Sequence, residues 1–153
     1  EHGFRLPGGI VLLDLALPLS CAAFQLPWRR FADVAAPAVG AAICVVRIGC
    51  FLNGCCFGAV ATNSSFGLRF PRASLAYTWQ LDHGHITLFD ASTLPVLPLQ
   101  LYYAALGLLL FLVCRRPLLR QRFASEVWLV FNFVFFSATF ALEFARPEPF
   151  PLN

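Results

Sequence analysis

The sequence predicts an all-α fold, a polytopic bundle of transmembrane helices with an irregular loop on one side, and three observations support this. Hydrophobic residues make up 59% of the chain and charged residues 12%, where soluble domains carry roughly 25% charged residues. The apolar residues form runs near the length of a membrane span instead of alternating short strands. Every basic residue is an arginine, and the arginines cluster between the apolar runs, which is typical of membrane topology.

Four apolar runs are long enough to be candidate spans. They lie at about residues 8–26, 31–52, 98–114 and 123–145. In the second run, Ala36, Gly40 and Cys44 recur every four positions, a spacing that lets two membrane helices approach closely. With no internal repeat, we expect a single membrane domain over residues 1–153, in which the polar, turn-rich segment 53–97 forms the loop.

The arginines also predict an orientation. Arg29 and Arg30 lie between the first two runs, and four more arginines lie between the last two. By the positive-inside rule both short connections face the cytoplasm, so the loop 53–97 faces the other side. The net charge of +3 is small, and this placement of arginines fits topology better than nucleic-acid binding, so we expect no nucleic-acid partner.

The two ends suggest an internal piece of a larger membrane protein. The chain begins with Glu1, no basic segment precedes an apolar one there, and the last residues follow closely on an apolar run. We therefore predict no signal peptide.

Charged residues within the spans predict a site. Arg47 lies near the outer end of the second span, Asp14 near that of the first and Glu143 near that of the fourth. Charges inside a membrane are costly, and their default interpretation is functional. An arginine fork matches phosphate oxygens bidentately, so we expect Arg47 to line a pocket for an anionic group, with Asp14 or Glu143 within ion-pair reach. An ion pair that only fixes packing is the alternative. The residues expected to supply an amide and permissive backbone beside Arg47 are Asn53, Gly54 and Gly58.

The stretch "VVRIGCFLNGCCFG" carries a resemblance to the prolipoprotein diacylglyceryl transferase family. That family's signature reads Gly-Arg-x-Gly-Asn-Phe-x-Asn-Gly-Glu-x-x-Gly. The residues in the same register here are Arg47, Gly49, Phe51, Asn53, Gly54 and Gly58.

Three further motifs follow the family's order. A Gly-Gly pair opens a span at Gly8 and Gly9. "LPLQLYY" is similar to the family's His-Pro-Ser/Thr-Gln-Leu-Tyr-Glu, and "EFARPEP" to its Glu-Phe-x-Arg. The matches in these two motifs are Pro98, Gln100, Leu101, Tyr102, Glu143, Phe144 and Arg146.

The resemblance implies a function at the outer face of the bacterial plasma membrane. The family transfers a diacylglyceryl group from phosphatidylglycerol to the lipobox cysteine in the signal peptide of a prolipoprotein, and glycerol phosphate leaves. For this chemistry we expect Arg47 to act on the phosphate and Glu143 to act as the base, and His83 and His85, on the outer loop, are further candidates for the base. The substrate-binding residues that the resemblance implies are Asn53, Gly54, Gly58, Gln100, Tyr102 and Arg146. Membrane lipid is the other partner, no metal or cofactor is implied, and two earlier spans and one later span would lie outside this chain.

Gln100 and Tyr102 also have a structural interpretation, as helix-capping and interfacial residues.

The chain departs from the family pattern at several polar positions. Family histidines fall at Pro7 and Leu97, the signature's first asparagine at Cys50, its glutamate at Cys55, and a second arginine at Thr139. These departures predict a divergent branch. A catalytically degenerate membrane protein that binds lipid or a partner is the first alternative function.

A cysteine cluster gives a second alternative. Cys50, Cys55 and Cys56 would lie on the oxidising side and could form a thiol–disulfide relay or a metal site. No fourth ligand is obvious, and no Cys-x-x-Cys is present. The cysteines expected to act as small apolar residues within spans are Cys21, Cys44 and Cys114.

Overall fold

Five helices make up the computed structural model, which describes residues 6–61, 66–115 and 122–143. They are α1 (Leu6–Ala23), α2 (Trp28–Asn53), α3 (Leu75–Asp82), α4 (Leu99–Arg115) and α5 (Glu126–Glu143). Within these ranges the extended segments meet only in isolated β-bridges, and no strand forms. The all-α prediction is therefore confirmed.

The apolar helices differ in length. In the described ranges, α2, with 26 residues, is the one helix both long and apolar enough to cross a membrane. Three shorter apolar helices, at residues 7–23, 99–115 and 126–142, coincide with the other predicted spans. The number of membrane crossings stays a prediction.

Local backbone geometry sets the helix ends a few residues away from the predicted ones. The first span was expected to reach residue 26, but α1 ends at Ala23, and Gln25 takes a left-handed φ of 54°. The fourth was expected to begin at residue 123, but α5 begins at Glu126, directly after Ser125 with a φ of 79°. Residues with positive φ cannot continue a right-handed helix.

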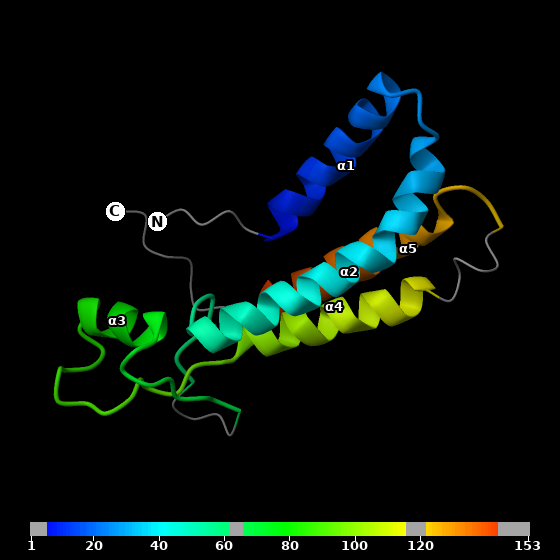
Figure 1. The fold of residues 1–153 in the computed structure, drawn as a ribbon. Coiled ribbons are helices and arrows are strands. Elements are labelled where there is room, and N and C mark those ends of the chain that lie inside the picture. Colours follow the sequence, from blue (N-terminus) through cyan, green and yellow to red (C-terminus); the bar gives the residue numbers. More distant parts are fainter. Residues whose placement is uncertain (1–5, 62–65, 116–121, 144–153) are drawn as a thin grey trace. The chain divides into compact units, whose positions relative to one another are not determined.

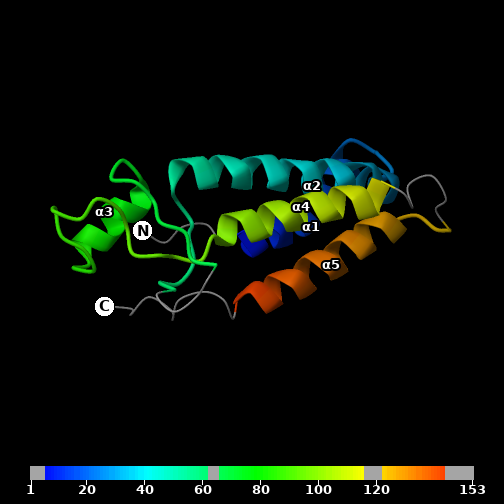
Figure 2. The same ribbon diagram turned by 90° about the horizontal axis from the view of Figure 1, so that it is seen from below.

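The chain divides into two compact units. Unit 1 comprises residues 1–42 and 107–140, and unit 2 comprises residues 43–106 and 141–153. Helices α2 and α4 each contribute one part to each unit, and within each unit the two parts lie beside one another (Figures 1 and 2). The single membrane domain predicted from the sequence stays a prediction.

In unit 1, α2 approaches α4 closely at Gly40. A Cβ atom on Gly40 would lie 2.8 Å from the backbone nitrogen of Phe111 and 3.1 Å from the carbonyl oxygen of Gly107. Ala32 and Ala36, on the same face of α2, are fully buried. The close approach predicted from small residues is confirmed at Gly40, where a side chain would force the helices apart.

Two aspartates of unit 1 hold the start of α5. The carboxylate of Asp33, on α2, is buried and accepts hydrogen bonds from the backbone N–H groups of Ser125 (2.7 Å) and Trp128 (3.0 Å). It therefore caps donors that the first turn of a helix leaves without intrahelical partners. Asp14, on α1, accepts hydrogen bonds from the indole Nε1 of Trp128 (2.8 Å) and from Nδ2 of Asn132 (3.3 Å).

In unit 2, the segment expected to be an irregular loop packs around a small core of its own. Phe70, Ala76 and Val96 are buried together, with two phenylalanines packed against them. Gln80, on α3, is fully buried, and its Oε1 accepts a hydrogen bond from the backbone N–H of Leu94 at 2.8 Å. Helix α3 and these contacts correct the prediction of an irregular segment.

Candidate functional site

Arg47 lies on the buried face of α2 in unit 2. The residue is only 9% exposed, and its Cζ stands 4.6 Å from the centre of the Tyr103 ring on α4. A guanidinium over an aromatic face is stabilised by a cation–π interaction, which leaves the N–H donors at its edge available. Among the residues that the structure describes, Arg47 makes no hydrogen bond and no ion pair. This part of unit 2 therefore contains a buried cation that has no acidic partner among the described residues.

The acidic partners expected for Arg47 stay predictions. Asp14 belongs to unit 1, where Trp128 and Asn132 already donate hydrogen bonds to it. Glu143 is the last residue of α5, but its side chain is not among the parts of the chain that the structure describes. Arg146 lies outside the described residues.

The turn after α2 requires a glycine at position 54. Gly54 has a φ of +67°, and a Cβ atom there would lie 2.6 Å from Cβ of Ser74. Its carbonyl oxygen accepts a hydrogen bond from the backbone N–H of Ala76 at 2.9 Å. Left-handed backbone and close approach both favour glycine, so this residue docks α3 against the end of α2.

Gly58 has a similar packing role a few residues later. Its N–H donates to the carbonyl oxygen of Leu97 at 2.8 Å, and a Cβ atom would lie 2.8 Å from Cγ of Leu99. Asn53 and Tyr102, two other predicted binding residues, are exposed at the end of α2 and the start of α4. The two glycines shape the backbone of unit 2, while Asn53 and Tyr102 keep polar groups accessible.

Gln100 connects the start of α4 with the segment after α2. The side chain is fully buried, and its Nε2 donates to the carbonyl oxygen of Cys55 at 2.7 Å. Its Oε1 is buried and has no hydrogen-bond partner within the described ranges. The contact of Gln100 with substrate stays a prediction, whereas its hydrogen bond to Cys55 holds the backbone of the segment after α2.

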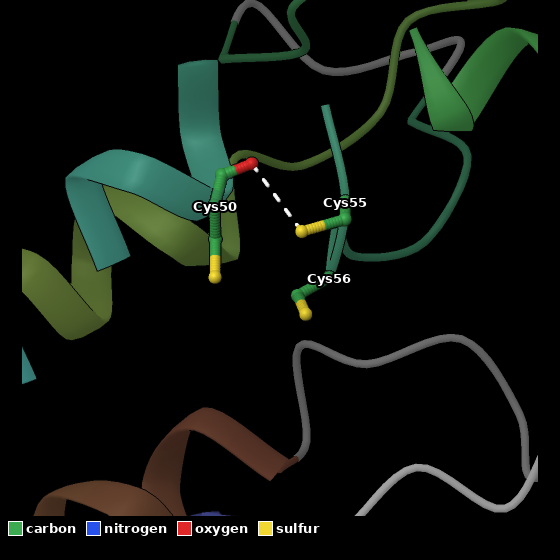
Figure 3. A group of neighbouring side chains, drawn as sticks. All are labelled: Cys50, Cys55 and Cys56. Atoms are coloured by element: carbon green, nitrogen blue, oxygen red, sulfur yellow. Dashed lines mark hydrogen bonds between the residues drawn. The ribbon is translucent and has the colours of Figure 1, made fainter. Parts of the chain in front are cut away.

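Three thiols gather beside this segment, as Figure 3 shows. Cys50 belongs to the last turns of α2, and Cys55 and Cys56 follow the helix directly. Their sulfur atoms all lie within 4.8 Å of one another, and the Cys55 thiol donates to the carbonyl oxygen of Cys50 at 3.6 Å. The clustering of these cysteines is therefore confirmed, and all three are free thiols.

The electrostatics of Cys56 link the thiols to Arg47. Burial raises the pKa of the Cys56 thiol, and the charge of a neighbouring Cys55 thiolate raises it further. The positive charge of Arg47 acts on this pKa in the opposite direction. The net effect is a pKa above the ordinary value for a cysteine thiol.

The two histidines considered as a base pack on an aromatic ring instead. His83 stacks on Trp79 with ring centroids 4.3 Å apart, and His85 does so at 5.6 Å. Nδ1 of His83 lies 2.8 Å from the Trp79 carbonyl oxygen. In the part of the chain that the structure describes, no hydrogen bond or ring contact joins either histidine to Arg47.

The sequence reasoning missed Asp33, although a signal was present. Asp33 is a charge within an apolar run, the same feature that singled out Asp14 and Arg47. Its partners Ser125 and Trp128, at the start of α5, are far away in sequence, so only the fold reveals that its role is to cap a helix.

Apolar helices with a charged side chain buried among them are typical of a membrane protein. The chain belongs to the prolipoprotein diacylglyceryl transferase family, whose model matches residues 1–153. No solved structure matches it.

Several curated relatives are similar to the chain. A phosphatidylglycerol–prolipoprotein diacylglyceryl transferase 2 of Clostridium perfringens strain 13 is 29% identical over 97% of this chain and 52% of its own length. The phosphatidylglycerol–prolipoprotein diacylglyceryl transferase of Burkholderia mallei strain SAVP1 is 29% identical over 98% of this chain and 55% of its own. The Rhodopirellula baltica protein of that name is 30% identical over 56% of this chain and 18% of its own. The chain thus spans about half the length, or less, of these relatives.

Proposed function

We propose that this chain is part of an enzyme that transfers a diacylglyceryl group from phosphatidylglycerol to the lipobox cysteine of a prolipoprotein, and that Arg47 binds the phosphate. The family and the names of the relatives support the reaction. The observation that carries the site is the buried Arg47, fixed over Tyr103 and without an acceptor among the described residues.

The chemistry needs a cation and a base. The cysteine thiolate of the prolipoprotein attacks the glyceryl carbon that bears the phosphate, forming a C–S bond as the C–O bond breaks. The electron pair stays on the phosphate oxygen of the departing glycerol phosphate, and Arg47 stabilises the charge that builds there. A base accepts the thiol proton, because the thiolate is the nucleophile, and Glu143 is the proposed base. The proposed substrate contacts are Asn53, Gly54, Gly58, Gln100, Tyr102 and Arg146.

We further propose a multi-pass arrangement in the bacterial plasma membrane. The four apolar helices α1, α2, α4 and α5 would be the spans, with unit 2 carrying the active face outside the cytoplasm. The coincidence of apolar helices with the predicted spans supports this, as do the arginines of the short connections. Single cysteines at positions 65 and 120 should be labelled from opposite sides of the membrane, and labelling from the same side would contradict the topology.

The replacement Arg47→Lys tests the phosphate role. Lysine keeps the charge but lacks the planar fork, so we expect transfer to fall roughly tenfold to a hundredfold while folding is retained. The assay follows labelled diacylglycerol from phosphatidylglycerol to a lipobox peptide, with the full-length protein.

Arg69→Lys is the matched control for this assay. Arg69 is an exposed arginine in unit 2, and its replacement should leave the transfer rate unchanged. If the Arg47→Lys variant transferred diacylglycerol at the same rate as the parent protein, the proposed role of Arg47 would be wrong.

A lipid-binding protein without transferase activity is the second candidate. It is favoured by Cys50, Cys55, Leu97 and Thr139, which stand where the resembled family has polar or charged groups. Binding of phosphatidylglycerol by the parent without transfer would decide for it, and Arg47→Lys should then weaken binding.

A further inference from the structure

We propose that Cys50, Cys55 and Cys56 form a binding site for a soft metal ion that prefers thiolate ligands, with zinc and copper(I) as the common cases. This site goes beyond the proposed lipid transfer and does not depend on it. Its basis is the distance of at most 4.8 Å between any two of the three sulfur atoms. Around zinc, with metal–sulfur bonds of about 2.3 Å in a tetrahedral arrangement, two sulfurs stand about 3.8 Å apart. Closure on an ion therefore needs adjustments of about 1 Å.

Three ligands are sufficient for such a site. The sequence argued against a metal because a fourth ligand was not obvious, but that requirement belongs to closed structural zinc sites. A zinc ion with three protein ligands keeps an open position for water, and thiolates also select copper(I). The exposed position of Cys56 gives an ion and a water molecule access to the three sulfurs.

The backbone around the thiols is held in a shape that brings the sulfurs together. Cys56 has a φ of 59°, a left-handed conformation that is unfavourable for a residue with a Cβ atom. Gln100, fully buried, holds the carbonyl oxygen of Cys55 at 2.7 Å. Cys50 is fixed by α2 itself. Such strain persists only where surrounding contacts impose it, and here it places the third sulfur beside the other two.

The charges of the site balance when an ion is bound. Three thiols release three protons to solvent and form three metal–sulfur bonds without any change of oxidation state. Bound zinc then carries a net charge of −1 and copper(I) a net charge of −2, counting the three thiolates. Arg47, three residues before Cys50 on the same helix, carries a positive charge that offsets part of it. A disulfide would instead join two sulfurs, exclude the third and require an oxidant.

Cadmium is the spectroscopic probe for the test. Full-length protein, reduced and purified in detergent, is titrated with Cd²⁺ while the ultraviolet thiolate-to-metal charge-transfer absorption is followed. We expect one ion per chain, three thiols protected from alkylation, and affinity that rises with pH because binding releases protons.

Matched variants make the test specific. Each of Cys50→Ser, Cys55→Ser and Cys56→Ser should weaken cadmium affinity on the order of a hundredfold. Gln100→Leu should weaken it about tenfold, because the loss of a residue that only orients a metal ligand lowers metal affinity roughly 10- to 100-fold. Cys44→Ser, on the same helix but outside the cluster, should change nothing. Equal helical circular dichroism shows that the variants are folded.

Separate titrations with zinc and with copper(I), each against a competing chelator, identify the natural ion class. The proposal is overturned if the parent binds cadmium no better than the triple serine variant, if only two thiols are protected, or if the three thiols are found partly as a disulfide that blocks the ion. Because the readout is metal affinity, failure here leaves the lipid-transfer proposal untouched, and loss of transfer leaves this site untouched.

Discussion

The two compact units use their polar side chains in different ways. In unit 1, Asp33 and Asp14 both accept two hydrogen bonds, from Ser125 just before α5 and from residues of α5 itself. In unit 2, Arg47 lies over the Tyr103 ring and makes no hydrogen bond or ion pair among the described residues, and three thiols stand beside each other without a disulfide. Polar groups with internal partners stabilise a fold, whereas accessible groups held in place can bind a ligand. Substitutions in unit 1 should therefore cost stability, and those at the site in unit 2 should cost function.

The largest effect on stability is expected from Asp33→Ala. This change leaves the buried N–H groups of Ser125 and Trp128 without an acceptor, and we expect the free energy of unfolding to fall by about 2–4 kcal/mol. Denaturant unfolding in detergent, followed by helical circular dichroism, measures it.

Asp82→Ala, at an exposed aspartate of α3, is the control and should change stability by less than about 0.5 kcal/mol. If Asp33→Ala were equally harmless, the aspartates of unit 1 would not be structural, and the contrast between the units would be lost.

Two glycines of α2 allow a second test of the difference between the units. Gly40, in unit 1, faces backbone atoms of α4, with Phe111 N 2.8 Å from a Cβ position, whereas nothing lies within 4 Å of a Cβ on Gly49, in unit 2. Gly40→Ala should destabilise by about 1–3 kcal/mol through overpacking.

Gly49→Ala should instead stabilise by up to about 1 kcal/mol, because alanine is the better helix former. The same unfolding measurement compares the pair, and a loss of similar size in both would show that packing in unit 1 is no tighter at this helix.

The smallest effect is a pH dependence of the turn at Asp90 in unit 2. Hydrogen bonds from the backbone N–H (2.7 Å) and the hydroxyl (2.9 Å) of Thr87 lower the pKa of the Asp90 carboxyl. A lowered pKa in the folded state contributes stability that is present above the unfolded pKa of about 3.9 and is lost as pH falls through the folded value.

Hydrogen exchange at the Thr87 amide should therefore accelerate as the pH is lowered below about 4, after correction for the intrinsic rate. Asp90→Asn should remove that additional acceleration. An unchanged pH profile in the variant would mean that another group controls the turn.

Much of the helical fold was predictable because its signal is local. A run of apolar residues near membrane length indicates a helix wherever it occurs, and the four predicted spans coincide with α1, α2, α4 and α5. Arg47 was also identifiable, since a charge in such a run stands out. Helix ends were less accurate, because Gln25 and Ser125 take positive φ values that their residue types do not announce.

The helical, apolar character of the chain and the unusual position of Arg47 within an apolar run could both be read from the sequence, because they depend on neighbouring residues. The roles of the polar groups could be assigned only from the folded structure. Asp33 meets Ser125 across 92 positions of the chain, and Gln100 meets the carbonyl oxygen of Cys55 across 45. Contacts at such separations depend on how helices pack and how turns bend, and local patterns carry no information on either. The three cysteines are close together in the sequence, but their sulfur atoms come within reach of a single ion only because of the turn after α2.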